Sequence, residues 1–515
     1  MINIGYEIER LITFGCDNCL LGEHDVIPAR NALLDLLGLS EPYDGSVEYF
    51  GETATEILEN ILDFAAQSGL LKANTTLFRD AFAARIMGLL IPRQSEVIRR
   101  FNNDYHVSPS LATDAFYSFS RACNYIQVDR ISKDIYWTGD SEFGELEITI
   151  NLSKPEKDPR DIAAARNAEP TNYPKCLLCV ENVGFAGTLT HPARQNHRVI
   201  PITLCDERWY FQYSPYVYFN EHCIILDEIH RPMELGRATF CRLFDFVEKF
   251  PHYFLGSNSD LPISGGSILT HEHYQGGRHV FPMQKAAPYS RFAHKQFENV
   301  RVYLVKWPMS VIRLVGSNKY DLIELATHIM NGWREYSDPA ALILASTDGV
   351  AHNSVTPIAR KNSEGLLEVD IVLRNNRTTP ERPFGLFHPG ENLHHIKKEN
   401  IGLIEVMGLT ILPGRLKKEL NAIGAILQGD MPFDKTSFGD ALHELHKHLE
   451  WLGYLTGRYG TSNTPEQADS IIKSEIVGKY RDVLSDAGVF KHNEQGILRF
   501  YKFMEAVGFK EWGNI

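Results

Sequence analysis

The chain lacks any apolar run long enough to span a bilayer, and it has few cysteines for its length. A membrane-crossing helix needs about 20 consecutive apolar residues, so the sequence predicts no membrane partner. The start, Met1–Arg10, has no basic stretch followed by an apolar signal core, which makes the cytoplasm the expected location. Eight cysteines among 515 residues do not make a disulfide framework, so a Cys-x-x-Cys pair here indicates a metal site, a redox pair or chance.

Positive charge is also scarce. The chain has 52 Lys and Arg residues against 65 Asp and Glu residues, which gives a formal net charge of −13 at pH 7. Binding to a nucleic-acid backbone needs a broad basic face, so we expect no nucleic-acid partner. Any anionic ligand must instead meet a local basic pocket.

The chain is longer than one hydrophobic core usually supports, and its apolar pattern predicts four regions. These are a mainly helical N-terminal region at 1–140, two sheet-rich halves at 141–298 and 299–412, and a helical C-terminal region at 413–515. The change from helix to sheet is visible where Leu146, Ile148, Ile150 and Leu152 alternate with polar residues, since a period of two is typical of a half-buried strand.

A strand–helix–strand order occurs twice after Trp209. The first copy has an apolar strand at 223–226, a helix with an apolar stripe at 240–250 and a strand with two histidines. The second has strands near 302–305 and 310–315, a helix at 322–333, and strands at 341–345 and 367–373. This repetition suggests an internal duplication. In the second copy, Ala351–Val355 would take the place of the two histidines.

The segment Gly265–Gly277 reads Gly-Gly-Ser-Ile-Leu-Thr-His-Glu-His-Tyr-Gln-Gly-Gly. In an extended strand, His271, His273 and Gln275 would project from one face. A neutral imidazole is a competent nucleophile toward phosphorus or acyl centres, and an amide can hydrogen-bond the oxygens of the transferred group. The same spacing would also fit a histidine-rich loop, or a metal cluster completed by His279.

Two Cys-x-x-Cys pairs are present. Cys176 and Cys179 could hold one tetrahedral zinc ion, although two ligands do not close a structural site. The alternative is a reduced pair packed as small apolar side chains. The other pair, Cys16 and Cys19, lies in an apolar helical stretch without neighbouring histidines, and we predict that it belongs to the core.

Phosphate recognition needs cations or backbone donors. Arg194 and Arg198 lie among Asn, Gln and His residues, a setting that core packing explains poorly. They are therefore the candidates for phosphate binding that the residues themselves suggest. A solvated loop is the alternative.

The motif His-x-His-x-Gln resembles that of nucleotidyl transferases in the histidine-triad-like superfamily, which carry Gln where the related hydrolases carry a third His. Other segments resemble the bacterial class II galactose-1-phosphate uridylyltransferases; they are Tyr173–Cys179, Thr190–Arg198, Gln212–Cys223, Pro251–Asn258 and Phe281–Met283. The resemblance implies an α/β (α+β) protein with a duplicated histidine-triad-like antiparallel sheet core and helical N- and C-terminal segments.

The resemblance also implies an activity, the transfer of UMP from UDP-glucose to galactose 1-phosphate. In this family the second histidine, here His273, forms a uridylyl-imidazole intermediate, and the glutamine, here Gln275, contacts the phosphoryl oxygens. A homodimer and no organic cofactor are expected by the same analogy. Two alternatives are another nucleotidyltransferase of the superfamily, such as a dinucleoside polyphosphate phosphorylase, and a nucleotide-sugar-binding protein without turnover.

Further site residues follow from the family match alone. It implies a structural zinc ion held by Cys176, Cys179, His230 and His271. It implies substrate contacts from Asn220, Asn258, Gly266 and Ser267, and hexose-phosphate contacts from Lys398 and Glu405, with one extra residue between Gly402 and Glu405 compared with the family segment. The chain departs from the family at Thr188 and Thr190, where an Arg and an Asn are usual.

Overall fold

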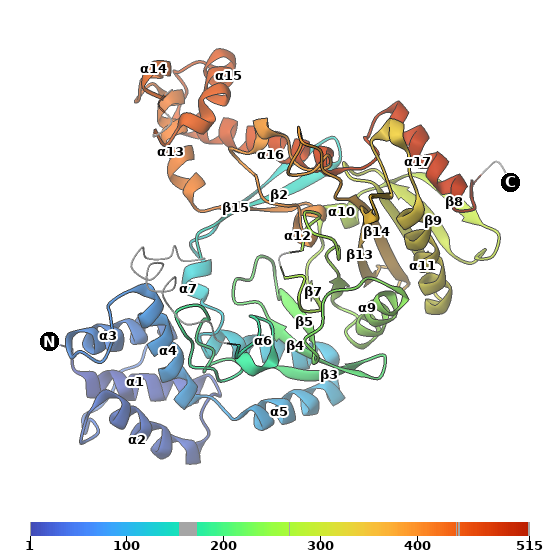
Figure 1. Cartoon of the computed structure of the whole chain (residues 1–515). Helices are drawn as coiled ribbons and strands as arrows, with labels where there is room; N and C mark the ends of the chain where they lie inside the picture. The colour runs from blue at the N-terminus through green and yellow to red at the C-terminus, as the bar shows by residue number, and fades with distance from the viewer. Residues whose placement is uncertain (1, 154–171, 267, 439, 441–442, 513–515) are drawn as a thin grey trace.

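The computed structural model describes residues 2–153, 172–266, 268–438, 440 and 443–512. Its N-terminal part is helical (Figure 1), with α1 Ile4–Asp17, α2 Val26–Leu37, α3 Ala54–Gln67, α4 Thr76–Leu90, α5 Gln94–Val107, α6 Pro109–Ala122 and α7 Val128–Ile131. Local sequence starts some of these helices; at α3, Thr53 and Glu56 cap each other's backbone N–H groups. Across the part of the chain described, no helix combines the length and the apolar character that a membrane crossing needs.

Within those residues, eleven strands form one antiparallel sheet in the order β16-β8-β9-β10-β14-β13-β6-β7-β5-β4-β3. The strands are β3 Ile200–Leu204, β4 Glu207–Tyr213, β5 Cys223–Asp227, β6 Phe254–Gly256, β7 His273–Gly277, β8 Pro288–His294, β9 Arg301–Val305, β10 Val311–Gly316, β13 Asn353–Lys361, β14 Leu367–Asn375 and β16 Phe509–Glu511. The predicted mixed α/β fold with an antiparallel sheet core is confirmed.

The sheet consists of two halves with the same topology. The first half has the spatial order β3-β4-β5-β7-β6 and the second has β8-β9-β10-β14-β13, and β6 pairs with β13 where the halves meet. Helix α9 (Arg237–Lys249) connects β5 to β6, and α11 (Lys319–Glu335) connects β10 to β13 in the same way. The five strands and the connecting helix of one half therefore have counterparts in the other.

This topology corrects two sequence-based predictions. Residues 351–355 were expected to replace the histidine pair, but they lead into β13, the counterpart of β6; the counterpart of β7 is β14. The strand predicted at 341–345 is also wrong, because a short 3-10 helix, Pro339–Ala341, and an isolated bridge between Asp338 and Ile343 occupy this stretch. Among residues 341–345 only Ile343 is buried and Leu342 is exposed, so this apolar run does not mark a buried strand.

The two faces of the sheet have different coverings. On one face, α9 and α11 pack with α5 and α6 over a core that includes Phe211, Phe240, Ile225 and Val369. The opposite face borders a second core, which contains Phe254, Ile358 and Val372. Because side chains alternate along a strand, the β7 residues on either side of the buried Tyr274 point to this second face.

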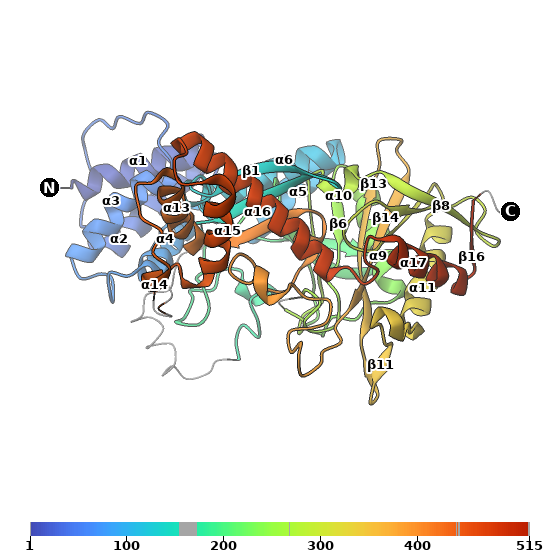
Figure 2. The ribbon, with the colours of Figure 1, turned by 90° about the horizontal axis from the view of Figure 1, so that it is seen from above.

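The second core also contains the small sheet β1-β2-β15 (Ile135–Ser141, Gly144–Asn151 and Leu409–Pro413) and several helices. These helices are α10 Pro282–Lys285, α12 Leu403–Val406, α13 Arg415–Gln428, α14 Lys435–Phe438, α15 Leu449–Tyr459 and α16 Pro465–Ala487. Helix α17 Glu494–Ala506 instead packs into the first core through Phe500, Phe503 and Met504, and the hairpin β11-β12 spans Ser346–Thr347 and Val350–Ala351. Figure 2 shows α16 running from α13 and α15 toward the large sheet. The chain then returns through α17 to β16, which pairs with β8.

The cysteines at the end of α1 do not lie in the core. Cys16 and Cys19 are both exposed, so the core prediction for this pair is wrong. The buried side chains of α1, including Ile8, Leu11 and Ile12, lie on another face of the helix. The apolar composition of this stretch predicted a helix with a buried face, but it did not show that the cysteines lie outside that face.

Candidate active site

Strand β7 carries the histidine–glutamine motif into the middle of the first half, between β5 and β6. The two glycines that end it are required by close backbone contact. A Cβ atom at Gly276 would lie 2.4 Å from the Phe254 carbonyl oxygen, and one at Gly277, where φ is +151°, would lie 2.7 Å from the Glu221 carbonyl oxygen. Any larger residue would displace the strand that carries His273.

His273 is held in one tautomer by the backbone. Its ring is 5% exposed, and Nδ1 lies 2.8 Å from the His271 carbonyl oxygen. A carbonyl can only accept, so Nδ1 carries the proton and Nε2 keeps its lone pair. Burial, together with the nearby His271, lowers the pKa of His273 to about 4. The ring is therefore neutral near pH 7, as a nucleophile must be.

Gln275 lies two residues further along the same face of β7. Its Oε1 lies 3.2 Å from Nε2 of His222, the residue that precedes β5. His222 is buried, and burial lowers its pKa to about 4. With Oε1 engaged, the amide NH₂ of Gln275 is the group left to bind a ligand.

Cys176, Cys179, His230 and His271 form a compact group of possible metal ligands. One ligand atom from each lies within 4.8 Å of all the others. The two Sγ atoms are 3.4 Å apart, His271 Nδ1 is 3.2 Å from Cys176 Sγ, and His230 Nδ1 is 3.1 Å from Cys179 Sγ. Tetrahedral zinc with bonds of about 2.0–2.3 Å separates its ligands by roughly 3.3–3.8 Å, so two thiolates and two imidazoles at these distances fit such an ion.

The second nitrogen of His271 supports this ligand role. Nε2 lies 2.9 Å from the Asp227 carbonyl oxygen, so it donates and leaves Nδ1 free to bind a metal. His279 does not join the group; its Nε2 lies 2.8 Å from Glu147. His271 thus carries its proton on Nε2, whereas His273 carries its proton on Nδ1. The His273 Nδ1–H donates to the backbone carbonyl of His271, which links the two residues.

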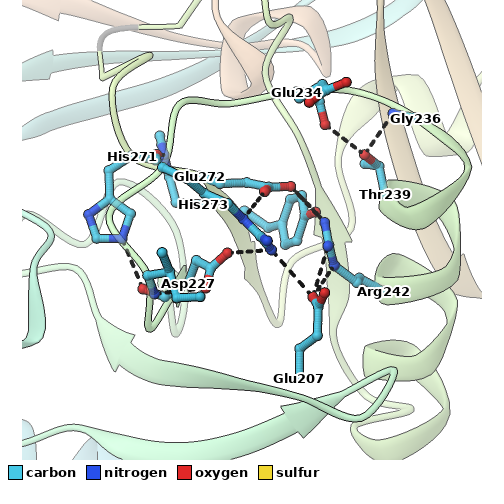
Figure 3. A network of polar contacts seen from close by, with 12 residues as sticks. Glu207, Asp227, Glu234, Gly236, Thr239, Arg242, His271, Glu272 and His273 are labelled. Carbon is cyan, nitrogen blue, oxygen red and sulfur yellow. Dashed lines mark hydrogen bonds and ion pairs between the residues drawn. The ribbon is translucent and has the colours of Figure 1, made fainter.

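Beneath the motif, Glu272 points to the other face of the strand and anchors it in a network of charges (Figure 3). Its carboxylate accepts from Arg242 Nη1 at 2.7 Å, from Arg231 Nε at 3.0 Å and from the Tyr274 hydroxyl at 3.0 Å. Arg231 also pairs with Asp227 at 2.6 Å. Burial opposes the charge of Arg242, but Tyr274, Glu272 and a further carboxylate more than offset this and raise its pKa. Arg231 follows His230 and Glu272 follows His271, so their ion pair connects the two segments that carry these histidines.

The second half of the chain reaches the same area through the segment around Gly402. Asn258 Oδ1 accepts from the Leu403 N–H at 2.8 Å. A Cβ atom at Gly265, where φ is +129°, would lie 2.8 Å from the Ile401 carbonyl oxygen. Asn258, Gly265 and the start of α12 therefore converge beside the loop that leads to the histidines.

The other predicted substrate residues are spread more widely. Glu405 accepts from the Gly402 N–H and from Lys397 Nζ, each within 2.9 Å. A Cβ atom at Gly266 would lie 2.6 Å from Leu269. Lys398 is exposed, with Nζ 4.9 Å from the centre of the Phe384 ring. Ser267 lies outside the described residues.

The two predicted arginines and Asn220 have local partners. Arg198 donates to the carbonyl oxygens of Pro92, Gln195 and His197, and Arg194 packs over the Tyr125 ring at 5.3 Å. Asn220 is exposed and donates to the Arg278 carbonyl. Their roles in substrate binding stay predictions. The Thr188 hydroxyl, where the family usually has Arg, accepts from the backbone of Thr190 and His191 and closes a tight turn.

Three residues of this region were missed in the sequence. His222 contacts Gln275, Lys397 forms the buried pair with Glu405, and Arg374 donates to the Ile401 carbonyl at 2.7 Å. Arg374 is 3% exposed, and burial lowers its pKa to about 10. It forms no ion pair with any described residue, and such a charge is costly unless a ligand or neighbour balances it. Two sequence signals lay near these contacts: His222 belongs to the family-like segment Gln212–Cys223, and Lys397 precedes the predicted Lys398.

Comparison with known proteins gives a consistent result. The family models described as galactose-1-phosphate uridyl transferase, N-terminal and C-terminal domain, match residues 21–232 and 246–450. A galactose-1-phosphate uridylyltransferase of Caldanaerobacter subterraneus subsp. tengcongensis is 54% identical over 512 residues, and one of Bacillus subtilis is 47% identical over 506 residues; each alignment covers 98% of both chains. A crystal structure of yeast Ap4A phosphorylase Apa2 with AMP is 11% identical, with a TM-score of 0.35, and the match covers 62% of this chain and 90% of that one.

Proposed function

Since the chain belongs to the galactose-1-phosphate uridylyltransferase family, we propose that it transfers UMP from UDP-glucose to galactose 1-phosphate through a covalent adduct on His273. The observation that carries the assignment of the nucleophile is the tautomer of His273. Its Nδ1 is committed to the His271 carbonyl, so Nε2 has a free lone pair on the face that it shares with Gln275.

In the first step, Nε2 of His273 attacks the α-phosphorus of UDP-glucose. The new P–N bond forms as the P–O bond to glucose 1-phosphate breaks, and glucose 1-phosphate leaves with that electron pair. In the second step, a phosphate oxygen of galactose 1-phosphate attacks the same phosphorus, the P–N bond breaks, and UDP-galactose forms. Two displacements at one centre leave both glycosidic bonds intact and give ping-pong kinetics.

The remaining residues of the site bind and orient. The NH₂ group of Gln275 donates to the phosphoryl oxygens, where charge builds up in the transition state. Asn258, Gly265 and Gly266 line the approach to the phosphates, and the buried charge of Arg374 favours an anionic ligand beside this segment. Lys398 and Glu405 serve the hexose phosphate, and Asn220 serves the uridine; these three roles rest on the family resemblance.

Zinc is the metal that the ligand group best fits. Two cysteines and two histidines close a structural site with no open position, so the ion would supply rigidity and no reactive water. Cys176, Cys179, His230 and His271 would hold it. By fixing His271, this site would also fix the carbonyl that orients His273.

The assembly and the location of the enzyme follow from the same proposal. We expect a cytoplasmic homodimer that binds no nucleic acid and no membrane. Light scattering of the purified protein tests the homodimer, and a mass of about 58.5 kDa, that of one chain, would refute it.

Mass spectrometry of protein incubated with UDP-glucose alone tests the function. We expect a UMP adduct that maps to His273, is absent from His273→Ala, and disappears when galactose 1-phosphate is added. An AMP adduct formed from a dinucleotide would instead indicate a phosphorylase. Binding of UDP-glucose without any adduct would indicate a nucleotide-sugar-binding protein.

A further inference from the structure

The proposed reaction gives His222 no role, yet among the described residues His222 forms the one side-chain hydrogen bond of Gln275. His222 is 3% exposed, and its ring contacts two aromatic rings, with centroids 4.5 Å from Phe219 and 5.6 Å from Tyr218. Nε2 reaches Gln275 Oε1 at 3.2 Å. Such a ring has little freedom, so the nitrogen that it presents to Gln275 is fixed.

The position of the proton on this ring decides which end of the Gln275 amide faces the substrate. If Nε2 carries the proton, it donates to Oε1, and the amide NH₂ is left to face the phosphoryl oxygens. If the proton moves to Nδ1, Nε2 can only accept, and the amide must turn its NH₂ toward His222. The carbonyl oxygen of Gln275 would then face the negatively charged phosphoryl group and repel it.

The surroundings favour the first arrangement. His222 Nδ1 is buried, and no described residue forms a hydrogen bond with it. A proton on Nδ1 would therefore be a buried N–H without an acceptor, while Nε2 would lose its donor role. With the proton on Nε2, the N–H has the amide oxygen as its partner.

We propose that His222 is a positioning residue of the transfer reaction, which donates from Nε2 to Gln275 and so keeps the amide NH₂ of Gln275 turned toward the phosphoryl oxygens. The role rests on the proposed function, because it needs a phosphoryl group that is transferred next to Gln275. It extends that function by a residue whose own atoms need not touch the substrate.

Three substitutions separate this role from a structural one. His222→Phe keeps an aromatic ring and removes the donor. His222→Asn places an amide near Nδ1, where it cannot reach Gln275, whereas His222→Gln places an amide N–H near Nε2. We expect the first two to slow adduct formation from UDP-glucose about tenfold, and His222→Gln to stay within about threefold of wild type, since one such hydrogen bond contributes up to about 1.5 kcal/mol.

A double-mutant cycle with Gln275→Ala provides the decisive readout. If His222 acts through Gln275, His222→Phe should slow adduct formation in the wild-type background but change it less than about twofold in the Gln275→Ala background. His252→Phe is the control, because His252 is also a histidine with a pKa lowered to about 4 by burial, but it contacts Thr113 instead of the site. We expect this control to match wild type.

The outcomes distinguish the two proposals. Equal losses from His222→Phe in both backgrounds, or no loss in the wild-type background, would overturn the positioning role. Equal activity of the Asn and Gln variants would overturn it as well, even if His222→Phe failed to fold. Wild-type protein that forms no UMP adduct from UDP-glucose would refute the proposed function, and the role of His222 with it.

Discussion

Replacing Arg242 tests whether the charge network under β7 holds the strand that carries His273 and Gln275. Arg242→Met keeps a long apolar side chain but removes the guanidinium, whose Cζ lies 5.1 Å from the centre of the Trp209 ring. Glu272, 4% exposed, then loses its partner at 2.7 Å and keeps only Arg231 at 3.0 Å and the Tyr274 hydroxyl. Removing one partner of a buried ion pair costs about 3–5 kcal/mol. Because Arg231 remains, we expect a loss of about 3 kcal/mol, at the lower end of this range.

A loss of this size is measurable by thermal unfolding. For a cooperative unit of 150–250 residues it lowers Tm by about 6–12 °C. Adding Glu272→Gln to Arg242→Met removes the unpaired charge, so the double variant should be more stable than the sum of the two single losses predicts, by about 1 kcal/mol or more. Arg237→Met is the matched control, since Arg237 lies on the same helix but pairs with Glu324 in solvent, where an ion pair contributes about 0–1 kcal/mol.

The same variants should lose activity, because Glu272 lies between His271 and His273 and its backbone also bonds to Arg231 and Asp227. We expect the rate of adduct formation to fall in Arg242→Met even at temperatures where the protein stays folded. A Tm within about 2 °C of wild type, a shift that corresponds to less than about 1 kcal/mol, would refute the reasoning. Strict additivity of the two substitutions would refute it too.

Three further predictions concern other parts of the molecule. Cys176→Ser should reduce bound zinc from about one per chain to near zero and lower Tm, because a metal that binds only the folded state stabilises it; Cys16→Ser, at an exposed cysteine, should keep the zinc. His197, whose pKa burial and the nearby Arg194 lower to about 3, is neutral in the fold but takes up a proton near pH 6.5 when unfolded, so stability should fall by up to about 2 kcal/mol from pH 7 to pH 5. His197→Gln should flatten this pH dependence in urea titrations, and an unchanged slope would contradict the assignment. Lys398→Ala should raise the KM for galactose 1-phosphate about tenfold or more, with a smaller effect on UDP-glucose; equal effects on both substrates would indicate a structural lysine.

Much of the fold follows from local patterns in the sequence. The alternation at 146–152 and 367–373 predicted β2 and β14, and the apolar stripe at 240–250 predicted α9. These elements each bury one face, and a buried face imposes a period on the sequence. The candidate site on β7 was predicted for another reason, because its histidines and glycines are unusual residues for a core.

The contacts that complete the site were beyond local patterns. In the sequence, Glu272 is only the residue between two histidines, but in the fold α9 places Arg242 against its carboxylate. Gln275 likewise contacts His222, which is 53 residues away in the sequence. Such pairs depend on strand order and register, which residue types do not reveal. The family resemblance supplied four candidate metal ligands, and the structure brings these residues together. The resemblance could not indicate that Lys397 is buried while Lys398 is exposed.

The duplicated architecture also explains why only the first half is expected to bind phosphoryl oxygens through β7. Across the centre of the sheet, Gln275 of β7 is level with Gly256, Ile358 and finally Asp370 of β14, so Asp370 occupies the same face in the second half. Asp370 is fully buried and bonds to Arg313 at 2.6 Å and to Arg360 at 2.6 Å. Burial opposes its ionisation, but the two arginines hold its pKa below the usual range. A carboxylate that is enclosed in this way cannot take over the proposed role of Gln275, because it has no N–H group to donate to phosphoryl oxygens, and leaving its partners would strand buried charges. The position of Gln275, which is proposed to bind the phosphoryl oxygens, is therefore occupied in the second half by a carboxylate within a buried group of ion pairs.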